Sequence, residues 1–300
     1  MFHGTMTALV TPFDNQGKID EEALRAHVER QIEAGVEGLV PAGTTGEAAT
    51  LSFEEHVEVI RITVEQANGR VPVIAGTGSN NTTESIELTQ AAKQLGADAA
   101  LLISPYYNKP TQEGIYLHYR AVAEAVHLPI LIYNVPGRTA SNILPQTIGR
   151  LSEIPNIVGI KDATGNMEQL VHAMELSAGL LEFYSGDDAS VLPFMALGGK
   201  GVISVVSNIA PRTMRELTDA MLSGSIEAAR QAQFAMRELN EMMFIQSNPM
   251  PVKAACYLLG WMPNRLRLPL TPLEGEVLAR LKAVMRRFDS GVERLEIVAD

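Results

Sequence analysis

The sequence predicts an α/β protein, a (β/α)8 TIM barrel with a C-terminal helical appendix. Segments with strand-like and helix-like patterns alternate from the start of the chain. Strand starts recur roughly every 20–35 residues, and the alternation continues for about eight units. A length of 300 residues suits a single barrel of this kind. The alternative is a doubly wound open sheet, but no Gly-x-Gly-x-x-Gly motif follows the first expected strand.

The expected strands are short apolar runs, rich in β-branched residues and bounded by glycine, proline or asparagine. Their regular spacing, with helical patterns between them, favours parallel pairing. They cover residues 5–10, 38–42, 71–77, 99–104, 130–134, 157–162, 181–185 and 201–205.

Capping residues mark the starts of the first helices. Asp20 can cap a helix that ends at Gly35. Residues 52–55 form a capping box before an apolar periodic stretch, and residues 81–84 form a second one. The helix that follows the second box is expected to stop at Gly96.

The pattern becomes purely helical after about residue 211, with no further strand-like run. We therefore divide the chain into a barrel, residues 1–224, with its active site at the C-terminal ends of the strands, and a C-terminal helical region, residues 225–300. Residues 289–300 are polar and are expected to fray in part, although residues 295–298 could dock. The expected late helices are residues 213–222, 225–244, 252–259 and 273–288.

Composition excludes several classes of protein. A hydrophobic content of 46% and a charged content of 20% are typical of a globular protein with a large core. The net charge of −11 argues against nucleic-acid partners and against binding to anionic membranes. The single cysteine, Cys256, allows no disulfide framework. No signal peptide or membrane span is visible, so a cytoplasmic location is expected.

The strand at residues 157–162 carries the strongest chemical signal. It is apolar on both faces and places Lys161 on the same face as Ile157 and Gly159. An apolar environment disfavours the charged ammonium and lowers its pKa. A neutral lysine can form a Schiff base with a carbonyl substrate. The structural alternative is a lysine that extends from the strand end to water.

Other polar groups follow the ends of other strands, where barrel enzymes place their active sites. Residues 43–47, Gly-Thr-Thr-Gly-Glu, can turn backbone N–H groups and hydroxyls toward an anion. Tyr133 ends one strand, and Arg138 just beyond it can bind a carboxylate. Each group alone also fits a structural role, as a turn, a core tyrosine or a surface arginine.

Two further strand ends carry polar pairs. Tyr106 and Tyr107 are adjacent, whereas Asp188 is expected to cap the next helix. The acidic pair at 187 and 188 and the scattered histidines form no metal-binding pattern, so no metal is expected. An amine, tyrosine and threonine hydroxyls, an anion-binding turn and an arginine together suit Schiff-base chemistry on a keto acid.

These residues give the chain its resemblance to the dihydrodipicolinate synthase / N-acetylneuraminate lyase family of pyruvate-dependent class I aldolases. The resemblance runs in order from about residue 4 to residue 270. The tyrosine pair and Arg138-Thr139 resemble the synthase branch most, which condenses pyruvate with L-aspartate 4-semialdehyde for lysine and diaminopimelate synthesis. The matching segments are residues 43–47, 106–110, 133–139, 159–166 and 185–188.

The resemblance implies the catalytic roles. Lys161 would form the imine with pyruvate, so no metal or organic cofactor would be needed. Tyr133 would act as general acid and base, and Thr44 would link it to Tyr107 in a proton relay. Tyr107 would reach into the neighbouring site across a tight dimer, and two such dimers would form a homotetramer.

The resemblance also implies the binding roles. Thr45 would bind the pyruvate carboxylate, and Arg138 would bind the semialdehyde carboxylate. Gly186 and the carbonyl of Ile203 would line the pocket. An inhibitory L-lysine site at the dimer interface would be formed by Ala49, His56, Asn80, Glu84 and Tyr106.

Two positions and the C-terminal tail depart from the family pattern. Asp162 stands where many synthases have glutamate, which we interpret as neutral. Phe53 stands where lysine-sensitive relatives often present a polar side chain, so any inhibition by lysine is expected to be weak to moderate. The tail beyond about Arg287 has no family counterpart.

Two other functions remain open from the sequence. A relative that cleaves N-acetylneuraminate or a 2-keto-3-deoxy sugar acid is one, although Arg138 suits a carboxylate better than a polyol. A barrel that has lost catalysis and serves as a binding protein is the other. The joint presence of Lys161, Tyr133, Tyr107 and Thr44 argues against it.

Overall fold

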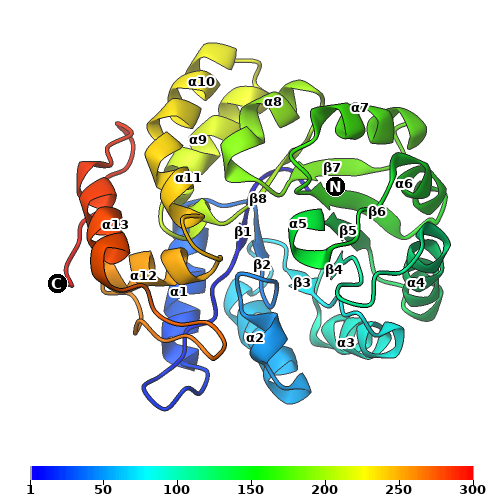
Figure 1. Cartoon of the computed structure of the whole chain (residues 1–300), viewed down its shortest axis with the longest axis horizontal. Coiled ribbons are helices and arrows are strands. Elements are labelled where there is room, and N and C mark those ends of the chain that lie inside the picture. Colours follow the sequence, from blue (N-terminus) through cyan, green and yellow to red (C-terminus); the bar gives the residue numbers. More distant parts are fainter. Residues whose placement is uncertain (1, 300) are drawn as a thin grey trace.

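The computed structural model describes residues 2–299 and contains one eight-stranded parallel barrel ringed by helices (Figure 1). The strands pair in the order β2-β1-β8-β7-β6-β5-β4-β3. A parallel bridge between Leu39 and Val73 joins β2 to β3 and closes the barrel. The predicted fold is confirmed. The strands are β1 (Gly4–Ala8), β2 (Gly38–Val40), β3 (Ile74–Gly76), β4 (Ala99–Ile103), β5 (Ile130–Asn134), β6 (Ile157–Asp162), β7 (Glu182–Ser185) and β8 (Gly201–Ser204).

Helices cover the outside of the barrel, and they alternate with the strands along the chain. Pro136, Pro145 and Pro211 each occupy the first turn of a helix, where the missing N–H is not needed. The bounds are α1 (Glu21–Glu33), α2 (Phe53–Ala67), α3 (Thr82–Leu95), α4 (Gln112–Ala125), α5 (Pro136–Thr139), α6 (Pro145–Ser152), α7 (Met167–Leu176), α8 (Val191–Ala196) and α9 (Pro211–Leu222).

Of the caps predicted for the first three helices, those of α1 and α2 are confirmed, and the one predicted for α3 is confirmed only in part. The Asp20 carboxylate accepts from Ala23 N at 3.0 Å, and the Ser52–Glu55 capping box is complete. The box predicted at residues 81–84 is wrong in its second half. Asn81 caps α3, but its own N–H donates to Ser79, and the Glu84 carboxylate accepts from the Ser79 hydroxyl instead.

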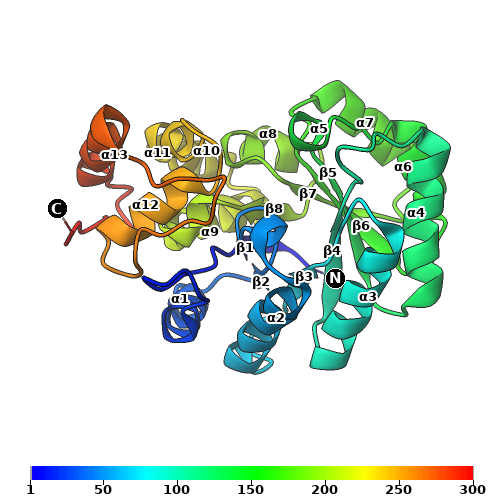
Figure 2. The same ribbon diagram turned by 60° about the horizontal axis from the view of Figure 1, so that its bottom comes forward.

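The C-terminal helical region packs beside the barrel against α9. Figures 1 and 2 both place these helices on the side opposite α4. The single helix predicted at residues 225–244 is in fact two, divided at the fully buried Met236. Within residues 2–299, no helix is both long and apolar enough to cross a membrane. The four helices are α10 (Ile226–Ala235), α11 (Arg237–Met243), α12 (Met250–Leu258) and α13 (Gly275–Arg287).

The chain end docks on α9 and on the C-terminal helical region. Glu293 accepts from the backbone N–H of Thr213 at 3.1 Å, and Val298 N donates to Leu258 O at 2.9 Å. Leu295 is buried in the core of the helical region. Residues 295–298 therefore dock on the protein, whereas the sequence suggested that part of this segment would fray. Residue 300 lies outside the described residues.

Apolar side chains fill the barrel interior and close its lower end. Met6, Leu101, Leu131 and Ile203 form part of this interior core. The Tyr184 hydroxyl donates to the carbonyl of Phe2 at 2.9 Å, so the segment before β1 covers the floor. The open end of the barrel is therefore the one where the strands terminate.

Candidate active site

Lys161 lies near the end of β6, and its side chain is almost fully enclosed. In the strand register it pairs with Tyr133 on β5 and with Tyr184 on β7. Its Nζ lies 4.3 Å from the centroid of the Tyr133 ring, and only 5% of the residue is exposed.

Gly186 makes room for this lysine, and Gly159 allows close packing against the neighbouring strand β7. A Cβ at Gly186 would lie 3.0 Å from Lys161 Cε and 2.8 Å from Ala163 Cβ. A Cβ at Gly159 would lie 2.9 Å from the carbonyl oxygen of Glu182 and 3.1 Å from the Tyr184 ring. The neighbours of Gly159 are Glu182, Tyr184 and Leu131, so the expectation that this glycine leaves space for the amine stays a prediction.

The surroundings of Lys161 favour its neutral form. Burial lowers the pKa of Lys161 to about 7, because the ammonium loses its water. The Asp188 carboxylate raises this pKa, and the Arg138 guanidinium lowers it further. A large fraction of neutral, nucleophilic amine is therefore present near neutral pH.

Tyr133 keeps its proton at neutral pH. Burial raises the pKa of Tyr133 to about 12, while Arg138 and a hydrogen bond with the Thr44 side chain lower it in part. Thr44 and Tyr133 both line the inner cavity, and the proton relay between them stays a prediction. A protonated hydroxyl beside a neutral amine can donate to an oxygen that leaves the substrate.

The Gly43–Glu47 segment forms a tight turn beside Lys161. Gly46 N and Ala48 N both donate to Gly43 O, at 3.1 and 3.2 Å, and Glu47 adopts a positive φ of 57°. Thr45 is 3% exposed, and its Oγ1 accepts from Asn248 Nδ2 at 2.9 Å. The turn therefore presents Thr44 and Thr45 at the barrel mouth in a fixed geometry.

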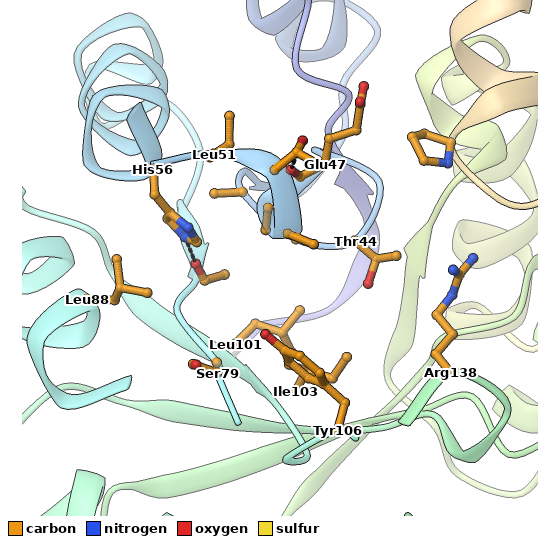
Figure 3. Close-up of a pocket in the computed structure, with 18 of the residues that line it drawn as sticks. Thr44, Glu47, Leu51, His56, Ser79, Leu88, Leu101, Ile103, Tyr106 and Arg138 are labelled. Carbon is orange, nitrogen blue, oxygen red and sulfur yellow. Dashed lines mark hydrogen bonds between the residues drawn. The ribbon is translucent and has the colours of Figure 1, made fainter. Parts of the chain in front are cut away.

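Two cavities meet at the mouth of the barrel. The inner cavity, about 270 Å³, surrounds Lys161, and the outer cavity is about 450 Å³. Figure 3 shows the outer cavity, with Thr44 and Arg138 at one end and His56 and Leu88 at the other. Six of the predicted site residues line the inner cavity: Thr44, Thr45, Tyr133, Arg138, Lys161 and Gly186.

Two predicted residues do not reach the inner cavity. Tyr107 is 89% exposed and has a φ of 73°, whereas its neighbour Tyr106 lines the outer cavity. Ile203 is fully buried in β8, and Val205 lines the inner cavity in its place.

Comparison with known proteins shows the family of this chain. The model of the dihydrodipicolinate synthetase family matches residues 1–287. The chain belongs to this family. The 4-hydroxy-tetrahydrodipicolinate synthase of Geobacter sp. (strain M21) is 54% identical over 288 residues, covering 96% of this chain and 99% of the relative. The predicted resemblance is confirmed, and the family match ends at the predicted start of the tail.

Solved structures of family members superpose on the whole barrel. One is a chloride-inhibited dihydrodipicolinate synthase from Acinetobacter baumannii complexed with pyruvate. It is 47% identical, with a TM-score of 0.94 over 98% of this chain and 100% of that one. Another, from Cyanidioschyzon merolae with lysine bound, is 39% identical, with a TM-score of 0.92 over 97% and 99% of the two chains.

The residues that the family resemblance assigned to lysine binding lie mostly in the outer cavity. Ala49, His56, Glu84 and Tyr106 line it. His56 Nε2 is 2.6 Å from Gly76 O, and burial lowers the pKa of His56. Asn80 is not among the lining residues.

Asp188 has a different role from the cap predicted for it. Asp187 caps the short helix instead, accepting from Ala189 N at 3.3 Å. The buried Asp188 carboxylate accepts from Val205 N at 3.0 Å and from Val206 N at 2.9 Å. Burial raises the pKa of Asp188 to about 6. Asp188 is not among the residues that line the two cavities, but its carboxylate raises the pKa of Lys161. The only sequence signal for this residue was its position just after a strand end.

Sequence reasoning also missed Asn248, which lines both cavities from the loop between α11 and α12. Arg138 Nη2 donates to its carbonyl at 3.4 Å. The Asn-Pro pair before a helix suggests only a turn, so no local signal identified Asn248.

Asp162, which stands where many synthases have glutamate, makes only local contacts. Its carboxylate accepts from Thr164 N and Oγ1 at 2.9 and 2.6 Å.

Proposed function

We propose that this chain is a 4-hydroxy-tetrahydrodipicolinate synthase that condenses pyruvate with L-aspartate 4-semialdehyde. One observation carries the proposal: a buried lysine with a pKa of about 7 lies against Tyr133 in a cavity that Arg138 also lines. The name and 54% identity of the Geobacter relative support it.

The first half of the reaction follows from Lys161 and Tyr133. The neutral amine attacks the keto carbon of pyruvate, and Tyr133 donates a proton to the oxygen, which leaves as water. The resulting imine withdraws electrons from the adjacent methyl group. Tyr133, which has given up its proton, takes one from this methyl group, and the resulting enamine is the carbon nucleophile.

The second half joins the two substrates. The enamine attacks the aldehyde carbon, and the new alkoxide takes a proton through Tyr133 and Thr44. The amino group of the semialdehyde then attacks the imine carbon, closes the ring and releases Lys161. The lysine supplies the electron sink, so this sequence requires no metal or organic cofactor.

Binding roles complete the proposal. Thr45 holds the pyruvate carboxylate and Arg138 the second carboxylate, while Gly186 bounds the pocket. The exposed Tyr107 serves the site of a second subunit in a homotetramer of two tight dimers. The proposed location is the cytoplasm.

The outer cavity is proposed to bind L-lysine as a weak to moderate inhibitor. The lysine-bound relative from Cyanidioschyzon merolae supports this role. Glu84, already bonded to Ser79, offers a carboxylate to the ammonium group, with Ala49, His56, Asn80 and Tyr106 around the ligand. Phe53 also lines the cavity and offers no hydrogen bond, which limits affinity.

The test is a synthase assay with pyruvate and aspartate semialdehyde, run beside a cleavage assay with N-acetylneuraminate. Synthase activity together with a pyruvate-derived mass on the Lys161 peptide after borohydride reduction supports the proposal. Cleavage of the sugar acid alone would assign the chain to a lyase. Absence of any imine would leave only the binding-protein interpretation.

A further inference from the structure

The C-terminal helical region reaches the barrel mouth through the segment that begins α12. Asn248 in this segment is 5% exposed and lines both cavities. Its side-chain Nδ2 donates to Thr45 Oγ1 at 2.9 Å across 203 positions of sequence. A residue outside the barrel thus contacts the hydroxyl assigned to the pyruvate carboxylate.

The direction of this hydrogen bond determines what Thr45 can offer a ligand. A threonine hydroxyl carries one proton and two lone pairs, whereas an amide N–H can only donate. Asn248 therefore occupies a lone pair of Thr45 Oγ1 and leaves the proton available. Among residues 2–299, no acceptor takes that proton.

The segment that carries Asn248 is held on two sides. Lys253, five residues later, donates to Glu47 Oε1 at 2.6 Å and to Thr11 O at 2.9 Å, with both side chains of the ion pair fully buried. On the other side, Arg138 donates to the carbonyl of Asn248 at 3.4 Å. The amide is thereby fixed against Thr45.

We propose that Asn248 is a positioning residue for pyruvate. Its amide orients the Thr45 hydroxyl so that the proton is presented to the pyruvate carboxylate. The inference rests on the proposed function in one respect, because it takes the ligand of Thr45 to be the carboxylate group of pyruvate. It predicts that the polarity of the side chain at position 248 matters, and not only its size.

Asn248→Asp tests this polarity, because aspartate has nearly the shape of asparagine but can only accept when ionised. The Thr45 proton would then turn to Asp, and a negative charge would lie beside the carboxylate site. Asn248→Ala removes the hydrogen bond that orients the Thr45 hydroxyl, and we expect it to raise the pyruvate KM roughly tenfold. Asn248→Asp should raise the pyruvate KM by more than this. In both variants kcat should change much less than the pyruvate KM.

A double-mutant cycle separates positioning from a general structural effect. If Asn248 acts through the Thr45 hydroxyl, Asn248→Ala should add little to the pyruvate KM in a Thr45→Val background. The pyruvate dependence of borohydride trapping at Lys161 gives the same readout without the second substrate. Thermal unfolding of each variant checks the fold.

Three results would overturn the inference: an unchanged pyruvate KM in Asn248→Asp, a loss confined to kcat, or additive effects of Asn248→Ala and Thr45→Val. The wild-type synthase assay tests the proposed function separately. A wild-type chain that traps pyruvate but makes no product would contradict the synthase proposal, while the cycle on trapping would still decide the role of Asn248.

Discussion

At Lys161, two neighbouring charges act in opposite directions on one buried amine. The carboxylate of Asp188 favours the ammonium form, and the guanidinium of Arg138 opposes it. Because burial has already brought the pKa of Lys161 to about 7, each charge changes the fraction of neutral amine near neutral pH. The pKa of the Lys161 amine therefore depends on charged residues that do not themselves react.

Borohydride trapping of pyruvate on Lys161 should increase with pH through about 7, because the amine must lose its proton to attack. Asp188→Asn removes a charge that raises this pKa, so the midpoint should move to lower pH. The measurement is the pH profile of the trapping rate at saturating pyruvate. An unchanged or higher midpoint in the variant would contradict the assigned electrostatic effect.

Arg138→Ala should weaken use of the semialdehyde while pyruvate still forms the imine. Loss of a charge-assisted pair costs on the order of 1.5–3 kcal/mol, so kcat/KM for the semialdehyde should fall roughly tenfold or more. Trapping should be compared at a pH where Lys161 is neutral in both proteins. Arg138→Lys keeps the charge but not the paired geometry and is the matched control. An equal loss of trapping and synthesis would show that the role is wrong.

The groups that the sequence predicted at the site all lie close to strand ends. Lys161, Tyr133 and Thr44 were found because a barrel brings its strand ends together, whatever their separation in the chain. Asn248 was missed because its contact with Thr45 spans 203 positions. Tyr107 stays a prediction, because 89% of it is exposed in the single chain.

At the scale of elements, prediction was best where the local sequence alone decides the boundary. The bounds of β5 and β6 are those predicted, because a proline precedes and a glycine follows each strand closely. The helix predicted at residues 225–244 divides into two because tertiary packing overrides helical periodicity. The proposed boundary between residues 224 and 225 stays a prediction.

Helix α12 carries Lys253, whose ion pair with Glu47 is fully buried. Lys253→Met should destabilise the protein by about 3–5 kcal/mol, because it leaves a buried carboxylate without its cation. Adding Glu47→Gln should recover part of this loss, since the amide oxygen can still accept from Arg267 N. Urea unfolding gives the free energies.

The matched control is the exposed ion pair between Arg237 and Glu241, whose side chains are 60% and 57% exposed. Arg237→Met should cost no more than about 1 kcal/mol. Similar losses in Lys253→Met and Arg237→Met would mean that burial of the first pair has little energetic consequence.

For the whole molecule, the exposed Tyr107 predicts that the functional unit is larger than one chain. Mixed dimers of inactive Lys161→Ala and inactive Tyr107→Phe subunits should recover activity, because one of their two sites combines both intact groups. The measurement is synthase activity after the two variants are unfolded and refolded together, with each refolded alone as the control. No recovery in dimers shown by mass to be mixed would count against a shared site.

The buried Glu47–Lys253 pair joins positions 206 residues apart and makes the barrel dependent on the helices that follow it. A chain cut after residue 224 leaves each fragment with one half of the pair. We therefore expect residues 1–224 and 225–300 to be inactive when produced separately and to form an active complex when co-expressed. The synthase activity of such a split enzyme would measure the association of its two fragments. Lys253→Met in the shorter fragment should abolish this activity.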